Sequence, residues 1–269
     1  MNFLSLMTRC KDEPFIEEFI NYYLKEGIEY IYIIDDNSTL KYSEYLLNHP
    51  KVMIYFENNI IEKDIANSVY KDIKDSTEWL IYVDVDEYIT TKKELSNTIR
   101  DELMNTFSDI DCIKIPWVMM SANKRDKNPT NLINETIDRW NHDKKHINTK
   151  SSEHKFRCRY EKIEVKCIFK PSKFDNIWDH HPKSPIGNFI CVDSIYQNRS
   201  DLSPFYDNLR EKDIKQAYLV CYHFRIISIE NSNSKIKNNI WYTSYTIDDL
   251  MSSDYAEIID KTLVNKMIK

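Results

Sequence analysis

Three acidic residues, Asp84, Asp86 and Glu87, follow the apolar run at 79–83. A short apolar run bounded by charge predicts a buried strand, and the carboxyl ends of strands are where open α/β sheets bind ligands. Carboxylates this close together repel one another unless a cation joins them. Hard divalent ions such as Mg²⁺ and Mn²⁺ favour oxygen ligands and commonly hold substrate phosphates. The run predicts a divalent-metal site, with a solvated acidic loop as the alternative.

The composition narrows the class of protein. The chain has 269 residues and a net charge of −6, and no basic face indicates nucleic-acid binding. The six cysteines form no C-x-x-C pair, which favours reduced thiols in the cytoplasm. Residues 3–7 are too short for a signal-peptide core, and no stretch approaches the roughly 20 apolar residues of a membrane span. With Gly27 and Gly187 as its two glycines, the chain cannot build a Walker or G-x-G-x-x-G phosphate loop. We therefore expect a soluble, cytoplasmic protein.

Alternating strand and helix patterns must position the carboxylates. Strands are predicted at 3–7, 30–34 and 52–56, with helices between them at 15–24 and 42–48. Gly27 is a natural stop for the first helix. A further helix is expected at 65–73, and the spacing of Leu95, Ile99 and Leu103 indicates another. This alternation favours an α/β fold with a mainly parallel sheet.

The second half of the chain is less regular. Strands are expected at 112–118 and near 165–169, on either side of a polar stretch at 121–155. Ile258, Leu263 and Met267 indicate a terminal helix within 248–269 that packs on the body of the protein.

Seven motifs resemble those of the GT-A fold glycosyltransferases in the family 92 and family 2-like group, in the order that this group has them. They are R-C-K-D-E at 9–13, Y-I-I-D-D-N-S-T at 32–39, Y-V-D-V-D-E-Y at 82–88, I-P-W at 115–117, K-C-I-F-K-P at 166–171, H-H-P at 180–182 and H-F-R at 223–225. The resemblance implies a GT-A, Rossmann-like fold whose central sheet is flanked by helices. It implies a single domain over 1–269, with a nucleotide-sugar-binding half at 1–110 and an irregular acceptor-side half with a C-terminal helix at 111–269.

The resemblance implies a metal site built around Asp86. Asp86, together with Asp84 directly or through water, would hold Mn²⁺ or Mg²⁺ against the diphosphate of a nucleotide sugar. The metal would offset the charge that builds on the departing nucleotide. His223 would be a late metal ligand or a diphosphate contact, and Lys235 would meet a phosphate. The alternatives are a structural histidine and a solvent-exposed lysine, while Glu87 would orient the loop or touch the sugar.

The nucleotide would be held by polar residues after the first two strands. Asp35, with Asp36 as the near alternative, would accept hydrogen bonds from uracil or ribose, and Arg9 would contact a phosphate or the base. Glu13 belongs to the same group of donor-binding residues. The alternative for Asp35 is turn chemistry, since Asp-Asn-Ser often forms turns. The alternative for Arg9 is a surface salt bridge.

Inverting transfer requires a base that takes the proton of the acceptor hydroxyl. The cluster Asp179, His180 and His181 is the best candidate, and Asp138 is a further one. A polar loop before Pro182 is the alternative. The rings of tryptophans 117 and 178 could stack on a sugar or belong to the core.

The leading hypothesis is a metal-dependent, inverting glycosyltransferase of the hexosyltransferase type. It would move a sugar from a nucleoside diphosphate, UDP in the first place, to a hydroxyl of a glycan or glycoprotein. A sugar nucleotidyltransferase shares this layout, but it normally carries a Gly-rich activating loop that this chain cannot form. A catalytically silent glycan-binding relic of the fold is the third possibility, and retention of Asp84, Asp86 and His223 argues against it.

Overall fold

Four parallel strands form one half of the central sheet. The computed structural model describes residues 1–58, 63–146, 162–199, 201–239 and 242–268. The four strands lie in the order β3 (Val52–Glu57), β2 (Tyr30–Asp36), β1 (Asn2–Cys10) and β4 (Thr77–Tyr82). Leu6 of β1 pairs with Ile31 on one side and with Ile81 on the other. The predicted strands at 3–7, 30–34 and 52–56 are confirmed. Strands β1 and β2, which lie inside the sheet, read as continuous apolar runs because both of their faces are covered.

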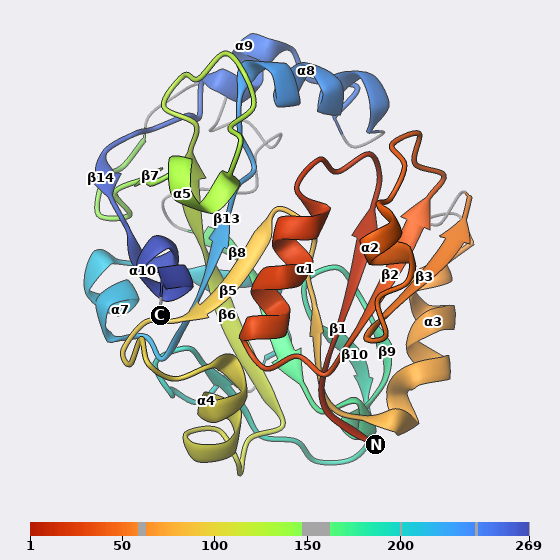
Figure 1. Ribbon diagram of the computed structural model, residues 1–269. Helices are drawn as coiled ribbons and strands as arrows, with labels where there is room; N and C mark the ends of the chain where they lie inside the picture. The colour runs from red at the N-terminus through yellow and green to blue at the C-terminus, as the bar shows by residue number, and fades with distance from the viewer. Residues whose placement is uncertain (59–62, 147–161, 200, 240–241, 269) are drawn as a thin grey trace.

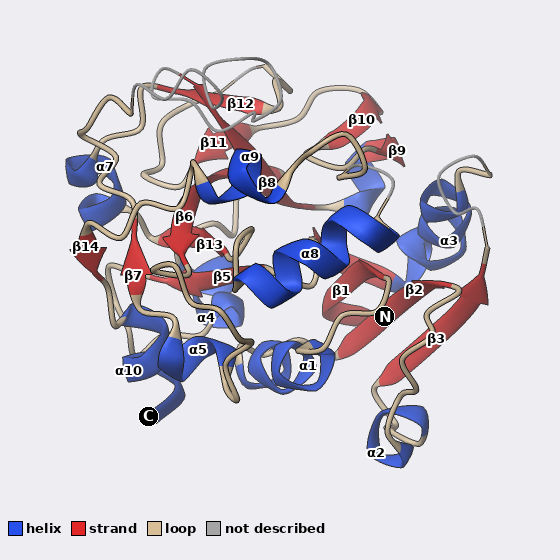
Figure 2. Ribbon diagram, turned by 90° about the horizontal axis from the view of Figure 1, so that it is seen from above, coloured by secondary structure: helices blue, strands red, loops and turns tan. Residues whose placement is uncertain are grey.

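Helices cover both faces of this half of the sheet (Figure 1, Figure 2). Helices α1 (Ile16–Lys25) and α2 (Glu44–Leu47) lie on one face, and α3 (Ile65–Ile73) lies on the other. Gly27 directly follows the C-cap residue of α1 and has a φ of 91°, a conformation that glycine adopts without strain. The predicted helices are confirmed, although α2 is shorter than the expected 42–48.

The other half of the sheet has mixed direction. Strand β8 (Lys162–Phe169) lies antiparallel between β4 and β6 (Cys112–Ser121). Strands β11 (Cys191–Asp193) and β13 (Leu219–His223) join β6 in parallel, while β7 (Asp138–Arg139) joins it antiparallel. Strands β12 (Phe205–Asp207) and β14 (Ile258–Ile259) pair with β8 and β7, and β9 (Phe174–Ile177) and β10 (Pro182–Pro185) form a separate ribbon. The α/β class is confirmed, but the sheet is parallel only in part.

The acidic run leads into a strand that the sequence did not predict. Strand β5 (Glu87–Thr91) pairs antiparallel with β13, and Glu87 lies opposite His223. This pairing brings a residue from the last third of the chain next to the carboxylates at 84–87.

The remaining helices within the described residues lie mainly in the second half of the chain. They are α4 (Ile99–Asn105), α5 (Leu132–Glu135), α7 (Glu211–Gln216), α8 (Ile229–Asn238), α9 (Ile247–Met251) and α10 (Thr262–Ile268), with 3₁₀ turns at Lys74–Ser76 and Pro171–Lys173. Thr98 caps α4 in a capping box with Asp101, so Leu95 lies outside the helix that it was expected to open.

The predicted terminal helix within 248–269 is wrong in its extent. Ile258 lies in β14, and α10 begins only at Thr262. The Asp260 carboxylate explains the break, because it binds Arg139 at 2.9 Å and also accepts the Thr262 N–H at 3.0 Å. It therefore anchors β14 and starts the helix after it.

One cluster of buried apolar side chains runs from Leu4 to Leu263 and joins both halves of the sheet. Five cysteines are buried free thiols, as predicted, and Cys158 lies outside the described residues. Among the described residues, no helix is long and apolar enough to span a bilayer.

Candidate active site

Asp84 lies between two cations at the carboxyl end of the sheet. It accepts a hydrogen bond from Arg9 Nη2 at 3.1 Å and another from Lys166 Nζ at 2.9 Å. Asp84 follows β4, while Arg9 lies in β1 and Lys166 in β8, the strands on either side of β4, so the sheet order brings the three together. Burial by itself would raise the pKa of Asp84, but Lys166 and Arg9 hold it far below its usual value. Asp84 is therefore a carboxylate whose oxygens already have partners.

Glu87 contacts the backbone of Asp84 and is fully buried. Its carboxylate accepts the Asp84 N–H at 2.7 Å and lies 3.1 Å from Lys166 Nζ. Burial raises the pKa of Glu87 well above its usual value, with Asp84 and Asp86 adding to the effect and Lys166 opposing it. Of the two roles predicted for Glu87, the geometry is that of a residue orienting the loop.

Asp86 faces a different pair of residues. Lys235 Nζ donates to its Oδ2 at 2.6 Å, and His223 Nε2 lies 3.6 Å from its Oδ1. The Asp86 carbonyl also accepts the Phe224 N–H at 2.8 Å, which fixes the end of β13 against the acidic loop. Burial would raise the pKa of Asp86, but Lys235 and His223 lower it overall. Strand β13 thus supplies the histidine, and α8 supplies the lysine.

The His223 imidazole is neutral at physiological pH. Burial, with Arg225 and Lys235 adding to it, lowers its pKa to about 3. Its Nδ1 is buried and has no hydrogen-bond partner among the described residues. The centroids of the His223 and Trp117 rings are 4.1 Å apart. A neutral imidazole is the form of histidine that binds a metal.

Asp86 and His223 fit a divalent metal as two ligands of suitable chemistry. No set of three or more His, Cys, Asp or Glu residues preformed for a metal occurs in the described part of the chain. A metal bound here would take its other ligands from substrate phosphate and water, as Mg²⁺ usually does.

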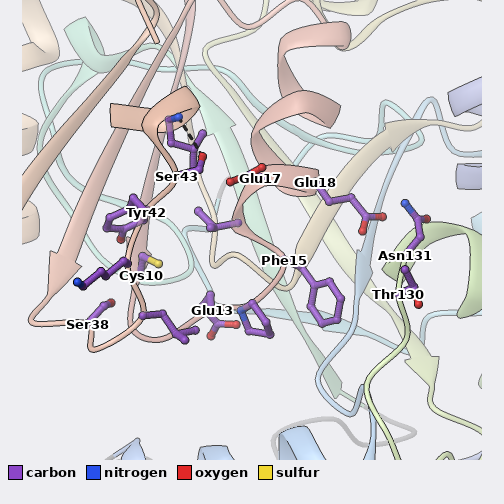
Figure 3. A pocket seen from close by; sticks show the side chains of 15 residues that line it. Cys10, Glu13, Phe15, Glu17, Glu18, Ser38, Tyr42, Ser43, Thr130 and Asn131 are labelled. Carbon is purple, nitrogen blue, oxygen red and sulfur yellow. Dashed lines mark hydrogen bonds between the residues drawn. The ribbon is translucent and has the colours of Figure 1, made fainter. Parts of the chain in front are cut away.

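Glu13 belongs to the same electrostatic cluster. Burial raises its pKa to about 7, with Asp86 and Asp84 adding to the effect and Lys235 opposing it. Glu13 also lines a pocket of about 490 Å³ between the start of α1, the loop after β2 and residues 130–131 (Figure 3). Cys10, Phe15, Glu18, Ser38 and Tyr42 line the same pocket. Glu13 thus lines this pocket and also interacts electrostatically with Asp86, and its donor-binding role stays a prediction.

Asp35 forms a turn. Its Oδ1 accepts the Ser38 N–H at 2.9 Å, and its Oδ2 accepts the Tyr42 hydroxyl at 2.5 Å. This arrangement is the alternative that the sequence left open for Asp35, and a nucleotide contact stays a prediction. The neighbouring Asp36 receives Lys11 Nζ on its carbonyl at 2.6 Å.

The candidate bases fall into two groups. Asp179 lies at the cluster, because its Oδ1 is 3.0 Å from Arg9 Nη1 and its carbonyl accepts Lys166 Nζ at 2.8 Å. His181 is on the same loop, and its Nδ1 donates to the Pro182 carbonyl at 2.7 Å. Burial lowers the pKa of His181.

The other candidates have partners outside the acidic loop. His180 is buried against Glu164 at 3.4 Å and against Trp117. Asp138 accepts a hydrogen bond from Asn123 at 3.2 Å, and none of its described contacts reaches Asp84 or Asp86. Trp117 is buried beside His180 and His223, whereas Trp178 is partly exposed.

Sequence reasoning assigned no role to Lys166, which joins Asp84, Glu87 and the carbonyl of Asp179. The signal was present, since a lysine stood inside the apolar strand predicted near 165–169. A buried lysine almost always has a charged partner.

Comparison with known proteins identifies the family. The model of glycosyltransferase family 92 matches residues 70–241, which is more than half of the chain and includes every residue from Asp84 to Lys235 described above. No curated protein matches the chain. The resemblance to family 92 is thereby confirmed, and the chain belongs to glycosyltransferase family 92.

Proposed function

We propose that this glycosyltransferase is a metal-dependent, inverting enzyme of the GT-A type. It transfers a hexose from a UDP-sugar to a hydroxyl of a glycan or glycoprotein. The observation that carries the proposal is the position of Asp86, whose carboxylate faces a neutral histidine and a lysine in one buried spot. Support for the GT-A type comes from the parallel half of the sheet, in which β4 ends at the acidic loop.

Asp86 and His223 would hold Mn²⁺ or Mg²⁺. When bound, the metal acts as a Lewis acid that offsets the charge on the departing nucleoside diphosphate. Lys235, already beside Asp86, meets the diphosphate as a point charge. Asp84 keeps Arg9 and Lys166 at the edge of this site, and Arg9 has a further N–H to direct toward phosphate.

The acceptor proton goes to a residue of the loop that carries Asp179 and His181. Arg9 and Lys166 fix this loop against Asp84, so that it borders the donor site. Burial lowers the pKa of His181, which favours the neutral imidazole, the form that can accept a proton. Asp179 offers a positioned carboxylate on the same loop.

A nucleotide-sugar panel with Mn²⁺ tests the proposal. We expect release of a nucleoside diphosphate from a UDP-sugar, with loss of that release in Asp86→Ala. Asp207→Ala, which removes an exposed carboxylate from β12, is the matched control and should keep the activity. The anomeric configuration of the product, read by NMR, tests inversion.

Two outcomes would contradict the proposal. Release of pyrophosphate instead of a nucleoside diphosphate would identify a sugar nucleotidyltransferase. Failure to bind any nucleotide in the presence of Mn²⁺ would leave the glycan-binding relic as the surviving hypothesis.

A further inference from the structure

Strand β3 forms an apolar outer edge of the central sheet. Among the described residues it pairs only with β2, and it lies at the end of the sheet in both views (Figure 1, Figure 2). The strand begins Val-Met-Ile-Tyr-Phe, yet none of its residues is buried. Met53 is 42% exposed and Phe56 is 65% exposed. Edge strands are normally protected by proline, inward-pointing charge or a covering element, and this strand has no proline and no charge before Glu57.

The N–H and C=O groups of alternate residues in β3 point toward β2 or away from it. The Ile31 N–H donates to the Lys51 carbonyl at 2.8 Å, so Lys51 directs this group toward β2. Backbone groups along a strand alternate in direction from one residue to the next. Ile54 and Phe56 therefore direct their N–H and C=O groups outward, where another strand can pair with them.

We propose that a second copy of this chain pairs with β3 in antiparallel fashion, about a twofold axis that passes midway between Ile54 and its copy. Such an axis stands perpendicular to the sheet and keeps each side chain on its own face. Ile54 then faces Ile54 of the second copy through outward backbone groups, and Val52 faces Phe56. On the opposite face, Met53 lies across from Tyr55.

Charge complementarity selects this register and this occupant. Centred on Ile54, the pairing sets Lys51 of each copy opposite Glu57 of the other, at both ends of the ladder. Within the described part of the chain neither side chain has an oppositely charged group at 4 Å or less, and the longer-range attraction of Lys51 to Glu29 leaves the Lys51 side chain exposed. Registers centred on Val52 or Phe56 use the same outward groups but separate Lys51 from Glu57. Lys51 and Glu57 match each other at both ends only when the second strand is another copy of β3. A strand from an unrelated protein has no reason to carry this symmetric pair of charges.

Exposed apolar side chains extend the patch beside β3. Leu40, Tyr45 and Leu47 come from the loop before α2 and from α2 itself, and each is about half exposed. The centroid of the Phe56 ring is 6.1 Å from that of Tyr42, which belongs to the same loop. The pairing would cover a surface larger than the strand alone. The proposal is independent of the donor site, since β3 contributes none of its residues.

Charge-reversal variants studied by sedimentation velocity test whether the chain dimerises through β3. The wild-type chain should be a concentration-dependent dimer. Lys51→Glu and Glu57→Lys each place like charges opposite one another twice, and each should weaken dimerisation about tenfold. The double variant Lys51→Glu/Glu57→Lys restores opposite charges and should recover most of the wild-type affinity. Circular dichroism melting should be similar in all four proteins.

A second variant probes the backbone. Ile54→Pro removes an outward N–H and leaves the ladder to β2 intact, since proline is tolerated at such edge positions. It should give a folded monomer. A wild-type chain that stays monomeric at every concentration would overturn the proposal, and so would a dimer whose affinity is the same in the single and double charge variants.

Discussion

The Lys235 ammonium donates to Asp86 Oδ2 at 2.6 Å, although the two residues are 149 positions apart in the chain. The same ammonium donates to the Arg225 carbonyl at 3.2 Å, and both Lys235 and Asp86 are buried. Lys235 therefore occupies one side of the carboxylate that we assign to the metal. A metal bound to Asp86 would compete with the lysine, and a bound diphosphate would offer the lysine another anionic partner.

Lys235→Met should change metal binding and nucleotide binding in opposite directions. Without nucleotide, Mn²⁺ should bind more tightly, because no ammonium competes for Asp86. With Mn²⁺ present, UDP should bind roughly tenfold more weakly, because a charged hydrogen bond to phosphate is lost. Isothermal titration calorimetry measures both affinities. Lys237→Met, an exposed lysine on the same helix, is the control, and an unchanged Mn²⁺ affinity in Lys235→Met would contradict the competition.

Lys166→Met should destabilise the fold. It leaves the Asp84 and Glu87 carboxylates without their shared cation in a buried place, and breaking such a pair costs about 3–5 kcal/mol. Urea denaturation measures the free energy of unfolding. The double variant Lys166→Met/Glu87→Gln should recover part of the loss. Lys162→Met, at the exposed start of the same strand, should be close to wild type, and an equal loss in both single variants would refute the assignment.

Glu13 should make metal binding depend on pH near neutrality. Its pKa of about 7 means that it gains negative charge as the pH rises through that value, and this charge attracts a cation beside Asp86. Mn²⁺ affinity should therefore rise across this range in the wild-type protein. Glu13→Gln should flatten the profile, while Glu17→Gln, an exposed neighbour, should keep it. A profile identical in wild type and Glu13→Gln would exclude this role.

His142 should make the fold less stable in acid. Burial, with Arg139 adding to it, lowers its pKa to about 3, and its Nε2 accepts the Met119 N–H at 3.3 Å. Because the folded pKa lies below the unfolded value of about 6.5, the stabilisation is present above pH 6.5 or so and is lost as the pH falls toward 3. By a pH of about 5 the loss should reach about 2 kcal/mol.

Urea denaturation of wild type and His142→Gln at several pH values checks this effect. The stability difference between the two proteins should shrink as the pH falls below about 6.5. His49→Gln, on the surface loop after α2, provides the comparison. A difference that stays constant with pH would show that the imidazole is not the titrating group.

Local patterns determined most of the strands and helices. The apolar runs that became β1, β2 and β4, and the helical spacing that became α1 and α3, reflect burial of one short segment at a time, and the run that became β3 is a strand pattern at the sheet edge. The ordered motifs also pointed to family 92 and to Asp84, Asp86, His223 and Lys235 as a group. Strand β5 escaped prediction because its residues follow an acidic loop without a turn signal, and the pairing with β13 that stabilises it is distant in sequence.

The pairing of the charged side chains could not be read from the chain and depends on how it folds. The sequence grouped Asp84 and Asp86 as one metal motif, but the fold gives Asp84 to Arg9 and Lys166 and gives Asp86 to His223 and Lys235. Alternate residues after a strand point in different directions, and their partners arrive with β8, β13 and α8. The residue types at the strand ends follow from local patterns in the chain. Their pairing depends on sheet order and strand register, which are set by contacts between segments far apart in the chain.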